Sequence, residues 1–542
     1  MDQLIAPYGG TLVNLLASPA RAETLRQEAL NLPSLELDWQ QLSELEMLLT
    51  GAYSPLVAYM TRSQCERVNA NHELDDGRLW PVPITLACKR PATSAKVGDR
   101  VALRDGEGYM LAVLTISDTW QTPEQLTCYG GQVEGVALPP HPDFSALRLS
   151  PAELRAQFSK RGWTKVVAWQ ARQPMHRAQF EFCLKSAIEN ECNLLLHPQA
   201  GGDLVESPAY FGLIRNFLSV RERFPAASTQ LALLPSLQRP VGQHDLMLRA
   251  IIARNYGCTA LIAGGEPERE GDCRRGEDLV QTTLATAGAQ AEKIGVKLIA
   301  YPRMVYVEDR AEHMPEPEAP PGSRILTLSS EEFQRRMQAG LKIPEWYSFP
   351  EVIAELQRST PPRTEQGFTV FFTGLSGAGK STLARALTAR LMEMGGRAVT
   401  LLDGDIVRRH LSSELGFTKA HRDINVRRIG FVASEITKNR GIAICAPIAP
   451  YRQTRRDVRA MVEAVGGFVE IHVATPIETC ESRDRKGLYA KARAGLIPEF
   501  TGVSDPYEIP SNPEIVIDTT ALKVDEAVQR ILLKLEHEGY WR

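Results

Sequence analysis

The sequence predicts a multidomain α/β protein, with a β-rich N-terminal domain followed by two domains that each contain a parallel sheet. Its 542 residues are too many for one hydrophobic core. With 43% hydrophobic and 23% charged residues, the composition is that of a packed globular protein. Over the last two thirds of the chain, apolar runs of strand length alternate with helical segments, which is typical of parallel sheets.

The N-terminal domain is expected over residues 1–150. Short apolar runs such as PVPITLAC (81–88) and GYMLAVLTI (108–116) are separated there by Gly, Pro and Asp turns. This pattern predicts a small domain that is rich in β-strands.

A first α/β domain is expected over residues 151–322. From residue 164 onward, strand-like runs alternate with helical segments such as 245–255. These runs are TKVVAWQ, NLLLHP, QLALLP, TALIAGG and VKLIAYP. The Pro-rich acidic stretch HMPEPEAPPGS (313–323) indicates a loop or a domain boundary.

A connecting region is expected over residues 323–361, and a second parallel α/β domain over residues 362–542. The stretch STPPRTEQG (359–367) has the composition of a linker. After it, strand-like runs again alternate with helical segments, which predicts a second parallel sheet. These runs are FTVFFTG, AVTLLDG, IAICAP, FVEIHVA and EIVIDT.

Charge and cysteine usage narrow the class of protein. The formal net charge of −3 creates no field that favours nucleic acid or a membrane surface. The nine cysteines are widely spaced and form no C-x-x-C pair, so we expect reduced thiols. The N-terminus lacks both a basic segment and a long apolar run. A cytoplasmic protein with neither a nucleic-acid nor a membrane partner is therefore expected.

A phosphate-binding loop is predicted at the start of the last domain. The sequence GLSGAGKS (374–381) matches G-x-x-x-x-G-K-[ST] between an apolar strand and a helix. Backbone N–H groups of such a loop surround phosphate oxygens, its lysine reaches the outer phosphates and its serine ligates Mg²⁺. The predicted ATP-binding residues are Gly374, Ser376, Gly377, Ala378, Gly379, Lys380, Ser381 and Thr382.

Two carboxylates, Asp403 and Asp405, follow the next predicted strand. Ligands of open α/β sheets bind at this end of the strands. One carboxylate suits the magnesium shell, and the other suits acceptance of a hydroxyl proton. Taken alone, a D-G-D sequence fits a simple turn equally well.

A cationic segment follows at residues 408–428. Its arginines suit bidentate binding of a phosphorylated acceptor, and Phe417 suits stacking on a base. Without the phosphate loop, a solvated basic helix face would be the preferred interpretation.

The last domain resembles adenylylsulfate kinase over residues 365–535. The resemblance rests on the ordered motifs GLSGAGKST, LLDGD, LGF, RDINVRRI, APYR and KGLYAKARAGLIPEFTGVSDPYEIP. It implies a P-loop NTPase fold, a homo-oligomer (dimer or hexamer), and phosphate transfer from ATP with Mg²⁺ to the 3′-hydroxyl of adenosine 5′-phosphosulfate (adenylylsulfate).

The resemblance also implies roles for individual residues. Asp405 would be the base, Lys380 would act beside it, and Asp403 would lie near the metal with Ser381. Residues 486–510 resemble the family's lid. The implied adenylylsulfate-binding residues are Arg408, Phe417, Arg422, Asn425, Lys491 and Phe500.

One position departs from the kinase family. Many relatives carry a serine, a candidate phosphoacceptor, where this chain has Ala449. Alanine cannot form a phosphoenzyme, so direct in-line transfer from ATP is the expected mechanism.

Residues 1–358 resemble ATP sulfurylase, which makes adenylylsulfate and pyrophosphate from ATP and sulfate. The resemblance rests on QARQPMHRAQ (170–179), AIIARNYGCT (250–259) and IPEWYSFPEV (343–352). It implies a PUA-like N-terminal domain and a Rossmann-like, nucleotidyltransferase-like α/β domain.

Several active-site positions of ATP sulfurylase are altered. Within the family motif Q-x-R-N-P-x-H-x-x-H, Gln173 and Gln179 replace the asparagine and the second histidine. The motif G-R-D-H-A-G appears as GGEPER (264–269), and R-Y-A-G-P-R-E appears as RPVGQHD (239–245). Losing one preorganised donor costs about 3 to 4 kcal/mol of transition-state stabilisation. The residues that remain are interpreted as a vestigial site, namely Gln170, Arg172 and His176.

Three functions fit these motifs. The preferred hypothesis is an adenylylsulfate kinase of sulfur metabolism whose sulfurylase-like half is a scaffold or a regulatory module. The second is a working bifunctional enzyme that converts sulfate to 3′-phosphoadenylylsulfate in two steps. The third is a nucleotide-gated binding or assembly protein, which would not need the acceptor-side residues.

Overall fold

The computed structural model describes residues 3–89, 95–201, 208–236, 239, 242–264, 278, 280–283, 285, 293–484 and 487–541. The chain divides into two compact units. The first comprises Met1–Phe333 with Ile343–Thr360, and the second comprises Gln334–Lys342 with Pro361–Arg542. Among the helices in the described ranges, none combines the length and the apolar character needed to span a bilayer.

The first unit begins with a six-stranded mixed sheet in the order β1-β4-β5-β6-β2, with β3 also paired to β6. The predicted strand 81–88 is shorter than expected, because Pro81 and Pro83 cannot donate to a sheet. The strands are β1 (Ser34–Glu36), β2 (Ala58–Tyr59), β3 (Leu86–Cys88), β4 (Arg100–Arg104), β5 (Met110–Gln121) and β6 (Thr127–Gly135), and the helices are α1 (Pro19–Glu28), α2 (Trp39–Leu49) and α3 (Arg62–Asn71).

A five-stranded parallel sheet follows, in the order β10-β8-β7-β12-β13. Its strands are β7 (Val166–Trp169), β8 (Asn193–Leu196), β10 (Thr229–Leu231), β12 (Ala260–Ala263) and β13 (Lys297–Ala300). Its helices are α4 (Pro151–Lys160), α5 (Arg177–Glu189), α6 (Pro208–Arg221) and α7 (Gln243–Asn255). The predicted strand QLALLP is split, and its last residues form β11 (Leu234–Pro235), which pairs with β9 (Gln199–Ala200).

The stretch HMPEPEAPPGS was predicted to be a loop or a domain boundary, and a loop is the wrong prediction for its first residues. They belong to β15 (Glu312–Pro315) of a small antiparallel sheet with β14 (Met304–Val307) and β16 (Ile325–Leu326). The strand forms because Met314 is buried against two valines of β14. The helices α9 (Ser330–Ala339) and α10 (Pro350–Ser359) follow.

The second unit contains a five-stranded parallel sheet in the order β18-β19-β17-β20-β21. Its strands are β17 (Phe368–Thr373), β18 (Val399–Asp403), β19 (Ile442–Ala446), β20 (Gly467–Val473) and β21 (Ile515–Ile517). Its helices are α11 (Lys380–Met394), α12 (Gly404–Leu411), α13 (Lys419–Lys438), α14 (Arg452–Glu463), α15 (Ile477–Arg483), α16 (Leu488–Arg493) and α17 (Val524–His537).

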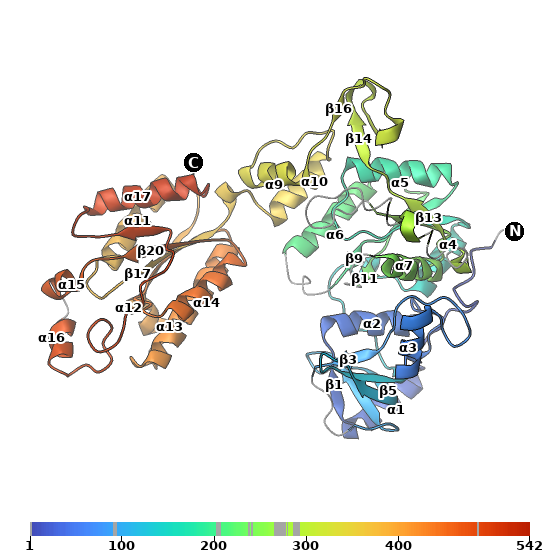
Figure 1. The fold of residues 1–542 in the computed structure, drawn as a ribbon, viewed down its shortest axis with the longest axis horizontal. Coiled ribbons are helices and arrows are strands. Elements are labelled where there is room, and N and C mark those ends of the chain that lie inside the picture. The colour runs from blue at the N-terminus through green and yellow to red at the C-terminus, as the bar shows by residue number, and fades with distance from the viewer. Residues whose placement is uncertain are drawn as a thin grey trace. The chain divides into compact units, whose positions relative to one another are not determined.

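Helices cover both faces of this sheet (Figure 1). On β17, Phe368 and Phe372 pack in an apolar cluster with α11 and α17, whereas Phe371 packs in a second cluster with α13 and α14. This burial on both faces explains why β17 reads as a continuous apolar run.

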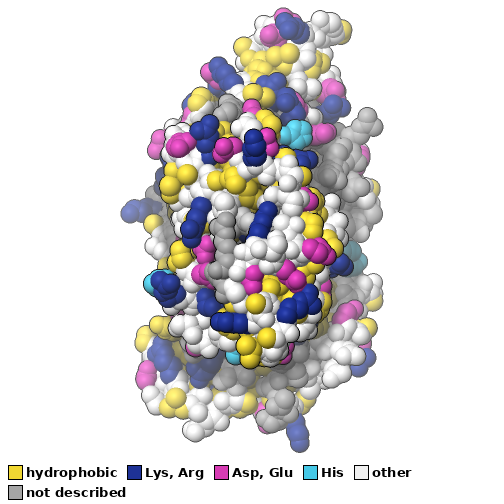
Figure 2. Space-filling model, turned by 90° about the vertical axis from the view of Figure 1, so that its left-hand side faces the viewer, with side chains coloured by type: hydrophobic (Ala, Val, Ile, Leu, Met, Phe, Trp, Pro, Cys, Tyr) yellow, Lys and Arg dark blue, Asp and Glu magenta, His cyan; other side chains and the backbone are white. Residues whose placement is uncertain are grey.

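The surface carries charges of both signs. On the face of the molecule in Figure 2, basic and acidic side chains are interspersed, with hydrophobic side chains between them. This mixture agrees with the formal net charge of −3.

Candidate active site

The phosphate loop lies between β17 and α11, as the sequence predicted. Gly374, Gly377 and Gly379 have φ angles of 149°, 76° and 104°. A Cβ on Gly374 would lie 2.5 Å from the carbonyl oxygen of Val473. Glycine is therefore required by both the backbone path and the close approach of β20.

Lys380 lies back over this loop. It is 7% exposed, and its Nζ donates to the carbonyl oxygens of Gly374 at 2.9 Å and Leu375 at 2.7 Å. The next two residues, Ser381 and Thr382, are exposed on the first turn of α11. The ammonium group and the helix N-terminus together make this loop electropositive, which favours phosphate.

Two threonines that sequence reasoning missed brace the loop. The hydroxyls of Thr475 and Thr519 donate to the carbonyl oxygen of Ala378 at 2.9 and 3.0 Å. The Thr519 hydroxyl also accepts from Arg483 Nη1 at 2.7 Å. The threonines lie just beyond β20 and β21, so only the strand order of the sheet would have indicated them.

Asp403 and Asp405 lie at the junction of β18 and α12. Asp403 is 4% exposed, and its Oδ1 accepts the backbone N–H of Asp405 at 3.0 Å, so it caps the helix. Asp405 is exposed in the first turn of that helix. The D-G-D sequence is therefore a helix start that presents a carboxylate beside the carboxyl end of the sheet.

Arg408 lies against Phe417, the aromatic residue predicted to stack on a nucleotide base. Its Nη1 donates to the carbonyl oxygens of Leu415 and Gly416, both at 2.9 Å. Its guanidinium carbon lies 4.5 Å from the ring centroid of Phe417, which is 66% exposed. Burial lowers the pKa of Arg408, and the nearby carboxylate of Asp405 opposes that shift. Arg408 is thus close both to Asp405, the predicted general base, and to the exposed ring of Phe417.

Arg422 and Asn425 lie on α13 and are both largely buried. Arg422 Nη1 donates to the hydroxyl of Thr501 at 2.6 Å. Within the described ranges, Arg422 Nε and Nη2 and Asn425 Oδ1 are buried without a hydrogen-bond partner. Such atoms are costly to bury unpaired, so they mark capacity for a ligand.

One tyrosine connects the predicted lid to the phosphate loop. The hydroxyl of Tyr489 donates to the carbonyl oxygen of Ser376 at 2.9 Å. Phe500 packs edge-on against the Tyr489 ring with centroids 5.1 Å apart. Lys491, also on α16, is exposed. Residues 485–486, at the start of the predicted lid, lie outside the described residues.

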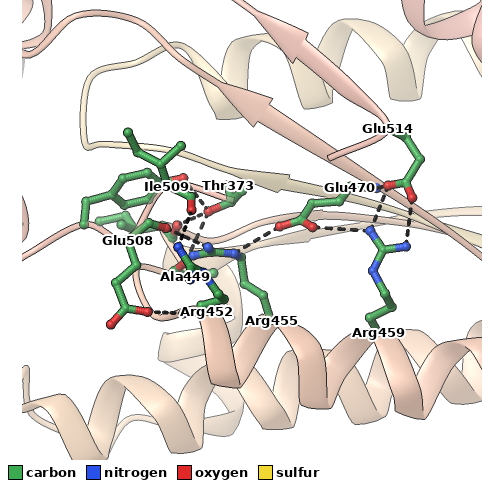
Figure 3. Close-up of polar contacts among 11 residues, drawn as sticks. Thr373, Ala449, Arg452, Arg455, Arg459, Glu470, Glu508, Ile509 and Glu514 are labelled. Carbon is green, nitrogen blue, oxygen red and sulfur yellow. Dashed lines mark hydrogen bonds and ion pairs between the residues drawn. The ribbon is translucent and has the colours of Figure 1, made fainter. Parts of the chain in front are cut away.

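A buried arginine supports the loop that contains Ala449 (Figure 3). Arg455 Nη1 donates to the carbonyl oxygen of Ala449 at 2.7 Å, and its Nη2 donates to that of Glu508 at 2.6 Å. Ala449 has a φ of 47° and is 1% exposed. The hydroxyl of Thr373, at the end of β17, also donates to the Ala449 carbonyl at 3.2 Å. Arg455 therefore joins the loop that contains Ala449 to Glu508, near the C-terminal end of the predicted lid.

In the first unit, Arg172 is engaged by its own neighbours. Its Nε donates to Gln199 Oε1 at 3.1 Å and its Nη1 to the carbonyl oxygen of Arg239 at 3.0 Å. Its Nη2 lies 3.6 Å from Oδ1 of Asp245, whose side chain is 3% exposed. These contacts tie the guanidinium to its own unit, where Asp245 is shared with Arg249, whose Nη1 lies 3.9 Å from Oδ2 of the same carboxylate.

The other two predicted vestigial residues are also packed internally. Gln170 Oε1 accepts from Arg249 Nε at 3.1 Å. His176 Nδ1 lies 2.8 Å from the hydroxyl of Ser348, and its ring packs 4.9 Å from that of Tyr347. Burial lowers the pKa of His176 to about 4, so the imidazole is neutral at physiological pH. Most of GGEPER and part of RPVGQHD lie outside the described residues.

Comparisons with known families match three consecutive regions. A PUA-like domain model matches residues 5–148, an ATP-sulfurylase model matches residues 145–359, and an adenylylsulphate kinase model matches residues 366–518. The sulfate adenylyltransferase of Aspergillus terreus (strain NIH 2624) is 40% identical over 568 aligned positions, covering 99% of each chain. That of Neurospora crassa is 39% identical, covering 98% of each chain.

A solved structure matches the whole chain. It is described as a hexameric APS kinase from Thiobacillus denitrificans, where APS is adenylylsulfate. It is 66% identical in sequence with a TM-score of 0.87, and the match covers 100% of this chain and 99% of that one.

Proposed function

This chain belongs to the sulfate adenylyltransferase family, in the form that joins PUA-like, ATP-sulfurylase and adenylylsulphate kinase domains, and from that premise we propose an adenylylsulfate kinase. The reaction is transfer of the ATP γ-phosphate to the 3′-hydroxyl of adenylylsulfate, which gives 3′-phosphoadenylylsulfate and ADP. The observation that carries the proposal is that, within the described ranges, buried polar atoms of Arg422 and Asn425 lack a hydrogen-bond partner, in the unit that also holds the phosphate loop.

In the proposed transfer step, the carboxylate of Asp405 takes the proton of the 3′-hydroxyl. The freed oxygen attacks the γ-phosphorus, and the bond from that phosphorus to the bridging oxygen of ADP breaks. Lys380 and the backbone of the loop bind the phosphates and stabilise the charge that spreads over them. The side chain at position 449 is a buried methyl group, which supports direct transfer over a phosphoenzyme at that position.

The acceptor is proposed to lie between α12, α13 and the lid. Arg408, Arg422 and Asn425 would bind its phosphosulfate and ribose, and the exposed ring of Phe417 would stack on its adenine. Phe500 and Lys491 belong to the lid, which would exclude water and so protect ATP from hydrolysis.

Magnesium is expected to accompany ATP. Ser381 and Asp403 fit this ion, because hydroxyl and carboxylate oxygens are the ligands that Mg²⁺ prefers. Asp403 uses Oδ1 to cap α12, so its second carboxylate oxygen is the one proposed for the metal. The bound ion would neutralise negative charge on the phosphates.

We further propose that the sulfurylase-like half is catalytically silent and acts as a scaffold or regulatory module. The guanidinium of Arg172 is shared among Asp245, Gln199 and a backbone carbonyl, so its donors are already engaged within the unit. His176 is neutral and packed against aromatic rings. Neither residue is arranged to stabilise a triphosphate and an incoming sulfate.

The alternative is a working bifunctional enzyme. It is favoured by the relatives that are 39–40% identical over the whole chain, because they are named sulfate adenylyltransferase. In that case, residues other than Arg172 and His176 supply the positive charge that sulfate activation needs.

A homo-oligomer in the cytoplasm is proposed. The solved structure with 66% identity is described as hexameric, which supports an oligomer here, either a dimer or a hexamer. The eight described cysteines are all free thiols, which fits a reducing compartment.

Two assays on the full chain test these proposals. The first follows phosphorylation of adenylylsulfate by ATP, and the second follows ATP formation from adenylylsulfate and pyrophosphate. Activity in the first assay alone is the expected result. Activity in both would establish the bifunctional alternative, and inactivity in the first would refute the kinase.

A further inference from the structure

Arg422 is held by a turn of the lid, which we define as residues 499–505. Its Nη1 donates to Thr501, and its Nη2 lies 3.1 Å from Oδ2 of Asp505 and 3.9 Å from Oε2 of Glu499. The Arg422 side chain is 11% exposed and that of Asp505 is 16% exposed, whereas that of Glu499 is 54% exposed. The principal counter-charge of Arg422 is therefore Asp505.

Asp505 is fixed in this position by its own turn. Its backbone N–H donates to the carbonyl oxygen of Phe500 at 3.1 Å, and its carbonyl oxygen accepts from the N–H of Gly502 at 2.7 Å. Its Oδ2, the same oxygen that faces Arg422, accepts the hydroxyl of Tyr451 at 2.7 Å. The turn thus places the carboxylate beside α13, where Tyr451 and Arg422 hold it.

The contact between Arg422 and Asp505 leaves hydrogen-bonding capacity on the arginine. Within the described ranges, Nε and Nη2 are buried and have no hydrogen bond of good geometry, although Nη2 is close to the carboxylate. A guanidinium binds carboxylate, phosphate and sulfate groups through the same N–H donors. An anionic acceptor and Asp505 are therefore competitors for one cation.

We propose that Asp505 is an internal competitor of adenylylsulfate, so that this carboxylate sets how tightly the acceptor binds. The inference rests on the proposed kinase function and adds a residue that opposes binding. When the acceptor arrives, its phosphosulfate takes the Nε and Nη2 donors, and the turn that carries Asp505 moves away from α13. Loss of the acceptor returns Asp505 to Arg422, which places the lid turn back over the site.

The test is direct binding of adenylylsulfate to the full chain in the presence of ADP, with steady-state kinetics alongside. Asp505→Asn keeps the size of the side chain and a partner for Tyr451, but it removes the charge. The dissociation constant and the KM for adenylylsulfate are expected to fall roughly three- to ten-fold, the range for loss of one partly buried counter-charge. The KM for ATP should stay within about two-fold.

Glu499→Gln is the matched control. It removes a lid carboxylate that is farther from Arg422 and more exposed, so its effect on adenylylsulfate binding should be under about two-fold. In an Arg422→Lys background, Asp505→Asn should give a smaller gain than in the wild type, because the planar donor set has been lost. Thermal unfolding of each variant verifies that the second unit stays folded.

The possible outcomes distinguish failure of the proposed competition from failure of the proposed kinase function. Tighter binding in Asp505→Asn with a small effect of Glu499→Gln supports the competition. Unchanged or weaker binding in Asp505→Asn, in a wild type that binds and turns over, overturns the competition and leaves the kinase intact. A wild type that neither binds nor phosphorylates adenylylsulfate overturns the kinase and the competition together.

Discussion

Nε of Arg455 lies 3.0 Å from Oε1 of Glu470, and these side chains are only 3% and 9% exposed. The pair lies at the centre of a network in which Arg459 also contacts Glu470 and forms a two-point ion pair with Glu514 (Figure 3). The same Arg455 bonds the carbonyl oxygens of Ala449 and Glu508. A buried ion pair thus connects β20 to the loop that contains Ala449 and to the part of the lid that contains Glu508.

Removing one member of this pair should destabilise the second unit. Arg455→Met leaves Glu470 buried with fewer counter-charges, which typically costs about 3 to 5 kcal/mol. Hydrogen exchange of the backbone of β20 and α14 measures this loss locally. The double variant Arg455→Met with Glu470→Leu should recover part of it, since no uncompensated carboxylate remains. Equal loss in the single and double variants would show that packing, not charge, is responsible.

Asp405→Asn should abolish phosphate transfer while nucleotide binding persists. Loss of a general base typically lowers the rate by a factor of about 10² to 10⁴. Turnover of adenylylsulfate and equilibrium binding of ATP are the two measurements. Asp525→Asn is the control, because Asp525 is likewise an exposed aspartate in the first turn of a helix, α17. Near-normal turnover in Asp405→Asn would remove Asp405 from the mechanism.

Tyr489→Phe should weaken ATP binding while the second unit stays folded. The variant removes the 2.9 Å hydrogen bond from the lid helix α16 to the carbonyl oxygen of Ser376. One such bond contributes about 0.5 to 1.5 kcal/mol, so the KM for ATP should rise by roughly two- to ten-fold. In Tyr540→Phe, the lost hydroxyl makes no hydrogen bond within the described ranges, and the KM should not change. A similar KM in both variants would contradict a link between lid and loop.

The sequence could predict the phosphate loop because its residues are contiguous and their spacing is dictated by phosphate chemistry. The strands of the second unit were also predicted, since burial within a parallel sheet produces apolar runs, although the run EIVIDT (514–519) extends beyond β21 at both ends. Thr475 and Thr519 could not be predicted, because each comes from a separate loop and they meet only through the order of β17, β20 and β21.

In the first unit, the sequence revealed the altered motifs but not the contacts of the residues that remain. The motif changes around Arg172 and His176 were visible in the sequence. However, the sequence could not show that Asp245, a residue 73 positions later, would lie 3.6 Å from Arg172. Nor could it show that His176 would bond Ser348 and pack among aromatic rings, because that pocket is assembled from segments distant along the chain.

Acid should destabilise the first unit partly through His176. Burial lowers the pKa of this imidazole from an ordinary value of 6.5 to about 4. Between these two values the unfolded chain binds the proton and the folded chain does not, so stability is complete above pH 6.5 and decreases as the pH falls toward 4. At about 1.4 kcal/mol per pH unit, the loss from this residue reaches roughly 3 kcal/mol.

The measurement is urea unfolding between pH 7.5 and 4.5, followed by tryptophan fluorescence, because six of the seven tryptophans belong to the first unit. In His176→Gln the side chain stays neutral at every pH, so the curve of stability against pH should be flatter than in the wild type, whatever the stability at neutral pH. His537→Gln, on the exposed side of α17, controls for loss of a histidine elsewhere. Identical slopes in wild type and His176→Gln would mean that the imidazole protonates in the folded state, and hence that it is accessible to solvent and available as a cation for an anionic ligand.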